Sequence, residues 1–174
     1  MKKCLFGLLI AVAAGLLPAT ASAAVMPSKA VRTAVGHWYF YHYVVEIGQL
    51  GSDASQIYVD ELSSGTTSGR LASDAQTVYG DALTDRAEYP APYKPLQREW
   101  SSMLTDVMVC MDDFTVVILK TADGASNADI VAASDRAMSA LVTAIQEEKA
   151  LGVTLKQLGF QPWAGISMLP LRGV

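Results

Sequence analysis

Cysteine and charge are both scarce in this sequence. Only two of its 174 residues are cysteines, which excludes a scaffold held by several disulfides and a cluster of zinc thiolates. Charged residues make up 17% of the chain, whereas soluble domains carry about 25%. The 17 acidic residues outnumber the 13 lysines and arginines, so the basic stripe of a nucleic-acid-binding protein is missing and no nucleic-acid partner is expected. With 51% hydrophobic residues, the composition is that of a globular protein rather than a disordered one.

The N-terminal segment has the pattern of a cleaved export signal. Lys2 and Lys3 precede an apolar run over residues 5–17, and the small residues of Ala21-Ser22-Ala23 follow where signal peptidase requires them. The apolar run is about 13 residues long, which is short of the roughly 20 that a membrane-spanning helix needs. The sequence therefore predicts a signal peptide over residues 1–23 and a periplasmic or secreted protein with no transmembrane helix after cleavage.

Cleavage after Ala23 leaves a mature chain of about 150 residues, which suffices for one hydrophobic core. We expect one helical-bundle domain over residues 24–160 and an irregular tail over residues 161–174, in which Pro162 and Pro170 interrupt an apolar stretch. Because large exposed apolar patches are rare on monomers, the tail is expected to pack across the bundle. The alternative is that the tail is offered to a partner.

Apolar residues recur at steps of three and four along most of the mature chain, which is the spacing of one face of an α-helix. The clearest series includes Trp100, Phe114 and Ile118, so both aromatic side chains are predicted to lie in the core. The fold class that follows is all-α, an antiparallel bundle of about four main helices. The expected helices span residues 29–50, 53–62, 74–88, 95–121 and 126–151, with a short further turn over 154–158.

Capping residues and glycines set the expected helix ends. Ser126 and Asp129 form a variant of the capping box, with Asp in place of Glu, at the start of the last long helix. Gly51, Gly124 and Gly152 follow the first, fourth and last of the expected long helices, and each is predicted to end the helix before it.

The segment Phe114–Leu119 is the one place where a strand competes with a helix. It is rich in β-branched residues, which favour strands. No second strong strand lies nearby to pair with it, so the segment is assigned to the helix.

Two short segments echo each other at a distance of 21 residues. Ser52-Asp53-Ala54 and Asp60 align with Ser73-Asp74-Ala75 and Asp81. The spacing equals three heptads, which is compatible with an old duplication. The favoured interpretation is simpler, namely that Ser-Asp-Ala is a common way to start a helix.

The most unusual segment runs from His37 to Tyr43 and contains both histidines of the chain and five other aromatic rings. On a helix, His37 and His42 lie about 140° apart, so one face cannot present both to a ligand. His42 falls in the polar sector with Glu46 and is predicted to be solvated. His37 falls in the middle of the apolar sector, beside Phe40, and is predicted to be a buried neutral ring with a hydrogen-bond partner on a neighbouring helix.

No arrangement typical of a catalytic or metal centre stands out. A di-iron bundle needs Glu-x-x-His motifs on two helices, and neither histidine has a Glu three residues before it. Asp112 and Asp113 are adjacent and point about 100° apart, whereas Asp106 and Asp113 share a face that is predicted to be exposed. Cys110 is predicted to be a small buried hydrophobe, and the sequence contains no nucleophile elbow of the Gly-x-Ser-x-Gly type.

These observations favour a non-enzymatic binding, sensing or accessory role in the cell envelope, with a protein partner or a small molecule as the ligand and no cofactor. One alternative is a haem-binding electron carrier, in which His37 and either Met103 or Met111 would hold the iron from facing helices. A second alternative is an enzyme with acidic active-site residues, which unusual burial around Asp112 or Asp113 would support.

Overall fold

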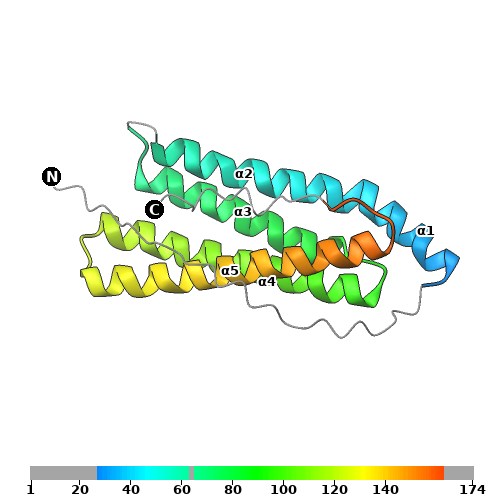
Figure 1. Cartoon of the computed structure of the whole chain (residues 1–174). Helices are drawn as coiled ribbons and strands as arrows, with labels where there is room; N and C mark the ends of the chain where they lie inside the picture. Colours follow the sequence, from blue (N-terminus) through cyan, green and yellow to red (C-terminus); the bar gives the residue numbers. More distant parts are fainter. Residues whose placement is uncertain (1–26, 63–64, 163–174) are drawn as a thin grey trace.

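The computed structural model describes residues 27–62 and 65–162, which form four helices and contain no strand (Figure 1). The elements are α1 Lys29–Trp38, the π-helical turn η1 Tyr39–Tyr43, α2 Val44–Leu62, α3 Ser68–Glu88, α4 Lys94–Ala122 and α5 Asn127–Gln157. The first helix is continuous and runs from α1 through η1 into α2. Helices that follow one another in the chain pack together, α2 with α3, α3 with α4 and α4 with α5.

Side-chain contacts show that neighbouring helices run in opposite directions. Arg136 of α5 binds Asp113 of α4, whereas Thr154 of α5 binds Glu99 of α4. Residue numbers therefore rise along one helix as they fall along the other. The prediction of an all-α antiparallel bundle with four main helices is confirmed, and the ambiguous segment 114–119 is helical, within α4.

The helix starts are set by capping side chains. Ser28, Thr67 and Ser126 stand at the N-caps of α1, α3 and α5, and each hydroxyl oxygen accepts a hydrogen bond from a backbone N–H of the first turn. The Ser126 hydroxyl also donates to the Asp129 carboxylate, whereas in a capping box that carboxylate would accept from the backbone N–H of Ser126. Gly124 follows α4 with a φ of +70°, the left-handed conformation that glycine adopts without strain.

Two of the predicted helix ends are wrong. Gly51 lies inside α2 and Gly152 inside α5, and both are buried. A glycine costs a helix interior about 1 kcal/mol relative to alanine, a cost that tertiary packing can outweigh. At Gly152 the backbone passes close to the chain that follows α5, because an added Cβ would lie 3.2 Å from the Cβ of Pro162. The start of α3 is also earlier than predicted, at Ser68, because Thr67 supplies a cap.

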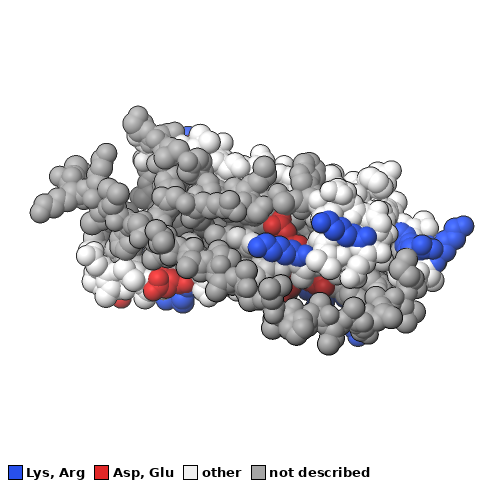
Figure 2. Space-filling view, in the orientation of Figure 1, with Lys and Arg blue, Asp and Glu red and all other residues white. Residues whose placement is uncertain are grey.

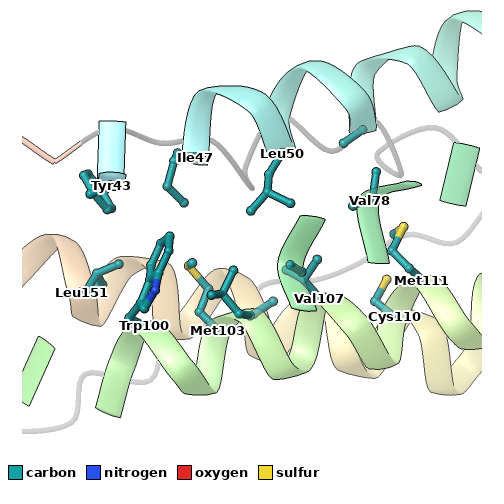
Figure 3. Close-up of a cluster of buried hydrophobic side chains, with 14 of the residues drawn as sticks. Tyr43, Ile47, Leu50, Val78, Trp100, Met103, Val107, Cys110, Met111 and Leu151 are labelled. Atoms are coloured by element: carbon teal, nitrogen blue, oxygen red, sulfur yellow. The ribbon is translucent and has the colours of Figure 1, made fainter. Parts of the chain in front are cut away.

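A cluster of buried side chains from all four helices forms the core (Figure 3). Trp100 is fully buried, as predicted, and meets the Trp38 ring edge-on with the ring centroids 5.5 Å apart. Phe114 packs against the core but is only half-buried. Cys110 is buried, as expected of a small hydrophobe. The labelled side chains are Tyr43 of η1, Ile47 and Leu50 of α2, Val78 of α3, Trp100, Met103, Val107, Cys110 and Met111 of α4, and Leu151 of α5.

The two ends of the sequence are only partly covered by this description. The predicted signal peptide over residues 1–23 and most of the predicted tail, residues 163–174, lie outside the described residues. The start of the tail contacts the bundle, since the Tyr39 hydroxyl donates a hydrogen bond to the carbonyl oxygen of Gln161. Among the described helices, none combines the length and the apolar character that a membrane crossing requires.

Candidate functional site

The turn η1 departs from the α-helix because the backbone N–H of Val44 donates to the carbonyl oxygen of Tyr39, five residues earlier. Such π-helical turns are rare and often occur at functional sites. Tyr39 and Tyr43 are buried in the bundle, whereas Phe40 and Tyr41 are exposed. The turn therefore carries aromatic rings on two sides of the helix, one facing the core and one facing solvent.

His37 is exposed, so the prediction that it is a buried ring is wrong. The buried side of the first helix passes through Val35, Trp38 and Tyr43 instead. Both sides of this helix are rich in apolar residues, and the side that packs inward is the one whose rings meet Trp100 on α4. The sector centred on His37 is left outside.

His42 is half-buried, so the prediction of a solvated ring is also wrong. Its ring stacks on that of Tyr89, with the centroids 4.5 Å apart and 15° between the planes. The carbonyl oxygen of Tyr89 accepts a hydrogen bond from Trp38 Nε1 at 3.0 Å. These contacts join the first helix to the residue that follows α3, so His42 has a structural role in this arrangement.

The outer side of the first helix carries a surface that we call the aromatic face, made of His37, Phe40, Tyr41 and Val45. Phe40 is 66% exposed, Tyr41 65% and Val45 55%. Residues 37, 41 and 45 are four apart, so they lie along one side of the helix. Single exposed apolar side chains are common on proteins, but a contiguous group of them marks an interaction site.

Two cations precede the aromatic face along the first helix. Lys29 and Arg32 are exposed in α1, and neither belongs to an ion pair between described residues. Figure 2 shows lysine and arginine side chains at the end of the molecule where Figure 1 places α1. The first acidic residue of the described chain is Glu46. This end of the first helix is therefore positive, on a chain whose net charge is −4.

The residues of the haem hypothesis are not brought together. His37 is exposed on α1, whereas Met103 and Met111 are buried in α4. In Figure 3, Met111 and the η1 residue Tyr43 lie at opposite ends of the buried cluster. Haem ligation would need the histidine and the methionine to face each other across one apolar slot, and this arrangement does not provide that geometry.

A second feature lies where α2 packs on α3. We call it the carboxyl row, six side chains that comprise Glu46, Asp53 and Asp60 of α2 and Asp74, Asp81 and Asp85 of α3. They face one another in three pairs, each with one member on each helix and close enough to raise the pKa of the α3 member: Asp60 with Asp74, Asp53 with Asp81, and Glu46 with Asp85. A carboxylate can only accept, so two carboxyl groups form a hydrogen bond only while one of them holds a proton.

Arg70 neutralises one end of the carboxyl row. Its Nε donates to Oδ2 of Asp60 at 2.7 Å. Burial favours the protonated form of Asp60, but hydrogen bonds from Gln56 and Arg70 outweigh it and hold the pKa of Asp60 below its usual value. Burial, together with the hydrogen bond and the negative charge of Asp60, raises the pKa of Asp74. Of this pair, Asp74 is therefore the member that takes up a proton first as the pH falls.

In the other two pairs, the pKa of the α3 carboxyl group is strongly raised. Burial, followed by the hydrogen bond and the charge of Asp53, raises the pKa of Asp81 to about 6. Burial, followed by the charge and the hydrogen bond of Glu46, raises the pKa of Asp85 to about 7. Asp85 is only 2% exposed, and its Oδ2 has no hydrogen-bond partner among the described residues. The α3 member of each pair is thus the one whose pKa is raised.

The 21-residue echo in the sequence was the available signal for the carboxyl row. It aligns Asp53 with Asp74 and Asp60 with Asp81, which are four of the six carboxyl groups. The interpretation of the two Ser-Asp-Ala segments as helix starts is wrong, because both lie inside helices, α2 and α3. The echo repeats one helix face, and the fold turns the two copies of that face toward each other.

Asp112 and Asp113, the acidic residues that the sequence suggested for an active site, do not belong to the carboxyl row. Asp112 is exposed. Asp113 is half-buried rather than exposed as predicted, because Arg136 donates to it from Nε at 2.9 Å. Neither shows the unusual burial that would support an acidic active site. Among the described residues, no group of three or more His, Cys, Asp or Glu side chains is arranged to hold a metal ion.

The aromatic face and the carboxyl row are thus the two candidate functional features. The first is exposed and apolar, and the second is shielded and acidic. Both belong to the N-terminal half of the described chain. Comparison with protein-family models, with curated protein sequences and with solved structures finds no match to this chain.

Proposed function

We propose that this protein is exported to the periplasm and has a non-enzymatic binding role, in which the aromatic face docks a helix of a protein partner. The observation that carries the proposal is the exposure of Phe40, Tyr41 and Val45, each more than half exposed on one side of a single helix. Leaving apolar surface in water is unfavourable by about 25 cal/mol per Å². A partner that covers this face would remove that cost, and aromatic residues are enriched in the centres of interfaces.

The aromatic face is ordered before any partner arrives. The His37 ring lies 4.5 Å from the Tyr41 ring, measured between centroids. The Phe40 ring meets the buried Tyr39 ring edge-on at 5.0 Å. Side chains that are already held in place lose less conformational entropy on binding, so these contacts support a docking role.

The surroundings of the aromatic face define the chemistry of the partner. A side chain series spaced by four residues along one helix fits the apolar side of another helix. Lys29 and Arg32, without ion-pair partners among the described residues, favour carboxylates next to that apolar side. A bilayer with anionic lipids fits less well, because the two cations add only about 1 kcal/mol each and the chain is negative overall.

Site-specific photo-crosslinking tests the docking proposal. Tyr41 is replaced by p-benzoylphenylalanine in the cells that produce the protein, and the adducts are identified by mass spectrometry. The matched control carries the same probe at Leu119 of α4, an apolar position that is 47% exposed but far from the aromatic face in sequence. We expect an adduct from position 41 that is absent from position 119, on a partner peptide with Asp or Glu about two to three helical turns from the crosslinked residue, because Lys29 and Arg32 lie that far from Tyr41 along the helix.

Charge reversal gives the second arm of this test. The double variant Lys29→Glu/Arg32→Glu is expected to lose most of the adduct, because it places two carboxylates opposite those of the partner. An adduct with a second copy of this chain, an adduct with lipid, or equal adducts from positions 41 and 119 would each contradict the proposed partner. An adduct that survives the charge reversal unchanged would contradict the acidic character assigned to it.

Export is tested by the mass of the protein that accumulates in cells. The pattern of the N-terminal segment predicts that the chain begins at Ala24 after processing. Intact-mass measurement of protein released from the periplasm is expected to match residues 24–174. Recovery of a species that retains Lys2 and Lys3 would overturn the export proposal without affecting the docking proposal.

A further inference from the structure

We propose that the contact between α2 and α3 is controlled by protons, so that the two helices stay packed while each pair of the carboxyl row shares a proton and separate when the pairs lose it. The row would make this half of the bundle an acid-stabilised clamp. The inference is independent of the aromatic face and of its partner.

The geometry gives every carboxyl pair the same position in the contact. One member comes from each helix, so ionisation of both members creates repulsion across the interface rather than within one helix. The α2 members stand at heptad spacing, at positions 46, 53 and 60, which returns them to the same side of the helix. Three repulsive contacts would therefore act along the same seam.

Asp85 provides an independent sign that a proton belongs in this seam. Its side chain is almost completely removed from water, and its Oδ2 has no hydrogen-bond donor among the described residues. A buried ionised carboxylate without such donors is strongly unfavourable. The neutral, protonated form removes the buried charge and can donate to the facing carboxylate of Glu46.

The charged groups around the seam offer little compensation. Arg70 binds Asp60 at one end. At the other end, His42 of η1 stands one helical turn before Glu46, with its ring stacked on Tyr89. Gln49 donates to Asp53 at 2.8 Å, which is a neutral contact. No cation among the described residues is paired with the central carboxyl groups.

Two carboxyl groups of α4, which also packs against α3, have partners on α5 rather than in the carboxyl row. On α4, Glu99 accepts from Thr154 and Asp113 binds Arg136, both on α5. Asp106 of α4 has a pKa raised by burial alone. The charges that act on the row therefore belong to the row itself and to Arg70, as the pKa values of its members also indicate.

The pH range of the change follows from Asp81 and Asp85 of α3. The pKa of Asp81 is raised to about 6 and that of Asp85 to about 7. A carboxyl group with a raised pKa stabilises the packed state at low pH, and this contribution is lost as the pH rises through the raised value. Separation of the helices is therefore expected as the pH passes from about 6 to about 7.

Distances between spin labels test the clamp in the full chain. One label pair, Ser52→Cys with Leu83→Cys, spans α2 and α3 at exposed positions beside the row. The control pair, Val109→Cys with Val142→Cys, spans α4 and α5 at exposed positions. Both are made in a background that replaces the native cysteines with alanine. Electron paramagnetic resonance is recorded at several values between about pH 5 and pH 8.

We expect the α2–α3 distance distribution to be narrow at pH 5 and to lengthen and broaden at pH 8, with its midpoint between about pH 6 and 7, while the α4–α5 distribution stays constant. The Asp81→Asn/Asp85→Asn variant, which cannot ionise at these positions, should keep the narrow distribution at every pH. The control Asp106→Asn should keep the transition of the wild-type chain.

Three results would overturn the proposal. An α2–α3 distance that does not change with pH would show that the row does not act as a clamp. A transition that persists in Asp81→Asn/Asp85→Asn would assign it to other groups. An equal change in the α4–α5 pair would show general loosening of the bundle rather than a local separation of two helices.

Discussion

The contacts α2–α3 and α4–α5 join antiparallel helices in the same bundle, but they differ in the charges they enclose. Between α4 and α5, Asp113 binds Arg136 and Glu99 accepts from Thr154. Burial raises the pKa of Glu99, and its Oε2 has no hydrogen-bond partner among the described residues. The carboxyl row between α2 and α3 sets acid against acid in all three of its pairs. In one interface the carboxyl groups have a cation or a hydroxyl donor opposite them, whereas in the other they face carboxyl groups.

The apolar residues of the two contacts do not explain this difference. Small buried side chains occur on a helix of each contact, with Ala75 and Ala82 on α3 and Ala137 and Ala144 on α5. The sequence therefore specifies two properties of the bundle separately. Apolar spacing makes the bundle, and the placement of a few charges decides under which conditions each part of it is stable.

The largest expected effect lies in the neutral core and is independent of the carboxyl row. Trp100→Ala removes a fully buried ring that packs against Trp38 and Tyr43, and we expect it to lower the free energy of unfolding by about 3–5 kcal/mol. Urea titrations at about pH 5 and pH 8 should give the same loss, because the site contains no titrating group. A loss that differs strongly between the two pH values would show that core packing and the carboxyl row do not act independently.

Asp85→Asn is expected to act in the opposite direction and only at higher pH. In the wild type, the stabilisation from protonated Asp85 is complete below the ordinary pKa of 3.8 and is lost as the pH rises through about 7. Asparagine is neutral at every pH and can donate to Glu46. The variant should be more stable than the wild type by about 1–3 kcal/mol near pH 8 and nearly equal to it near pH 4. Equal unfolding midpoints near pH 8 would mean that Asp85 carries no buried charge there.

Removing the one cation of the row should have a smaller effect, again with a pH dependence. Arg70→Gln leaves Asp60 facing Asp74 without a positive charge, and the pKa of Asp60 should rise because a hydrogen bond and an attractive charge that lower it are lost. Thermal melts should show a greater fall in Tm near pH 8 than near pH 5. Arg86→Gln, at an exposed position on the same helix, is the matched control and should change neither value.

Some parts of this structure could be predicted from the sequence. The number of helices, the burial of Trp100 and the cap at Ser126 depend on spacing and on local hydrogen bonds, and these were predicted. The ends at Gly51 and Gly152 were not, because they depend on whether a glycine is packed in the finished structure. A local pattern contains no information on that packing.

Neither the aromatic face nor the carboxyl row could be predicted by considering one helix at a time. The first helix is apolar on two sides, and only its meeting with Trp100, far along the chain, decides that Trp38 faces inward and Phe40 outward. The echo of Asp53 in Asp74 was visible, but its meaning requires knowing that α2 and α3 turn these faces toward each other. Helical periodicity identifies a face, whereas the identity of its neighbour is a property of the fold.

The smallest expected effect concerns the ion pair between Asp113 of α4 and Arg136 of α5, which contrasts with the facing carboxyl groups of the carboxyl row. Arg136 binds Asp113 from Nε and Nη2, each at 2.9 Å, with the Arg136 side chain 58% exposed. Such a pair is worth about 0.2–1 kcal/mol because water screens it. Asp113→Ala should therefore lower the free energy of unfolding by no more than about 1 kcal/mol, and the loss should shrink in high salt. A double-mutant cycle with Arg136→Ala isolates the pair from other effects of each substitution. A coupling energy well above this range would place the pair among buried contacts, and the contrast between a partly exposed complementary pair and a row of facing carboxyl groups would no longer hold.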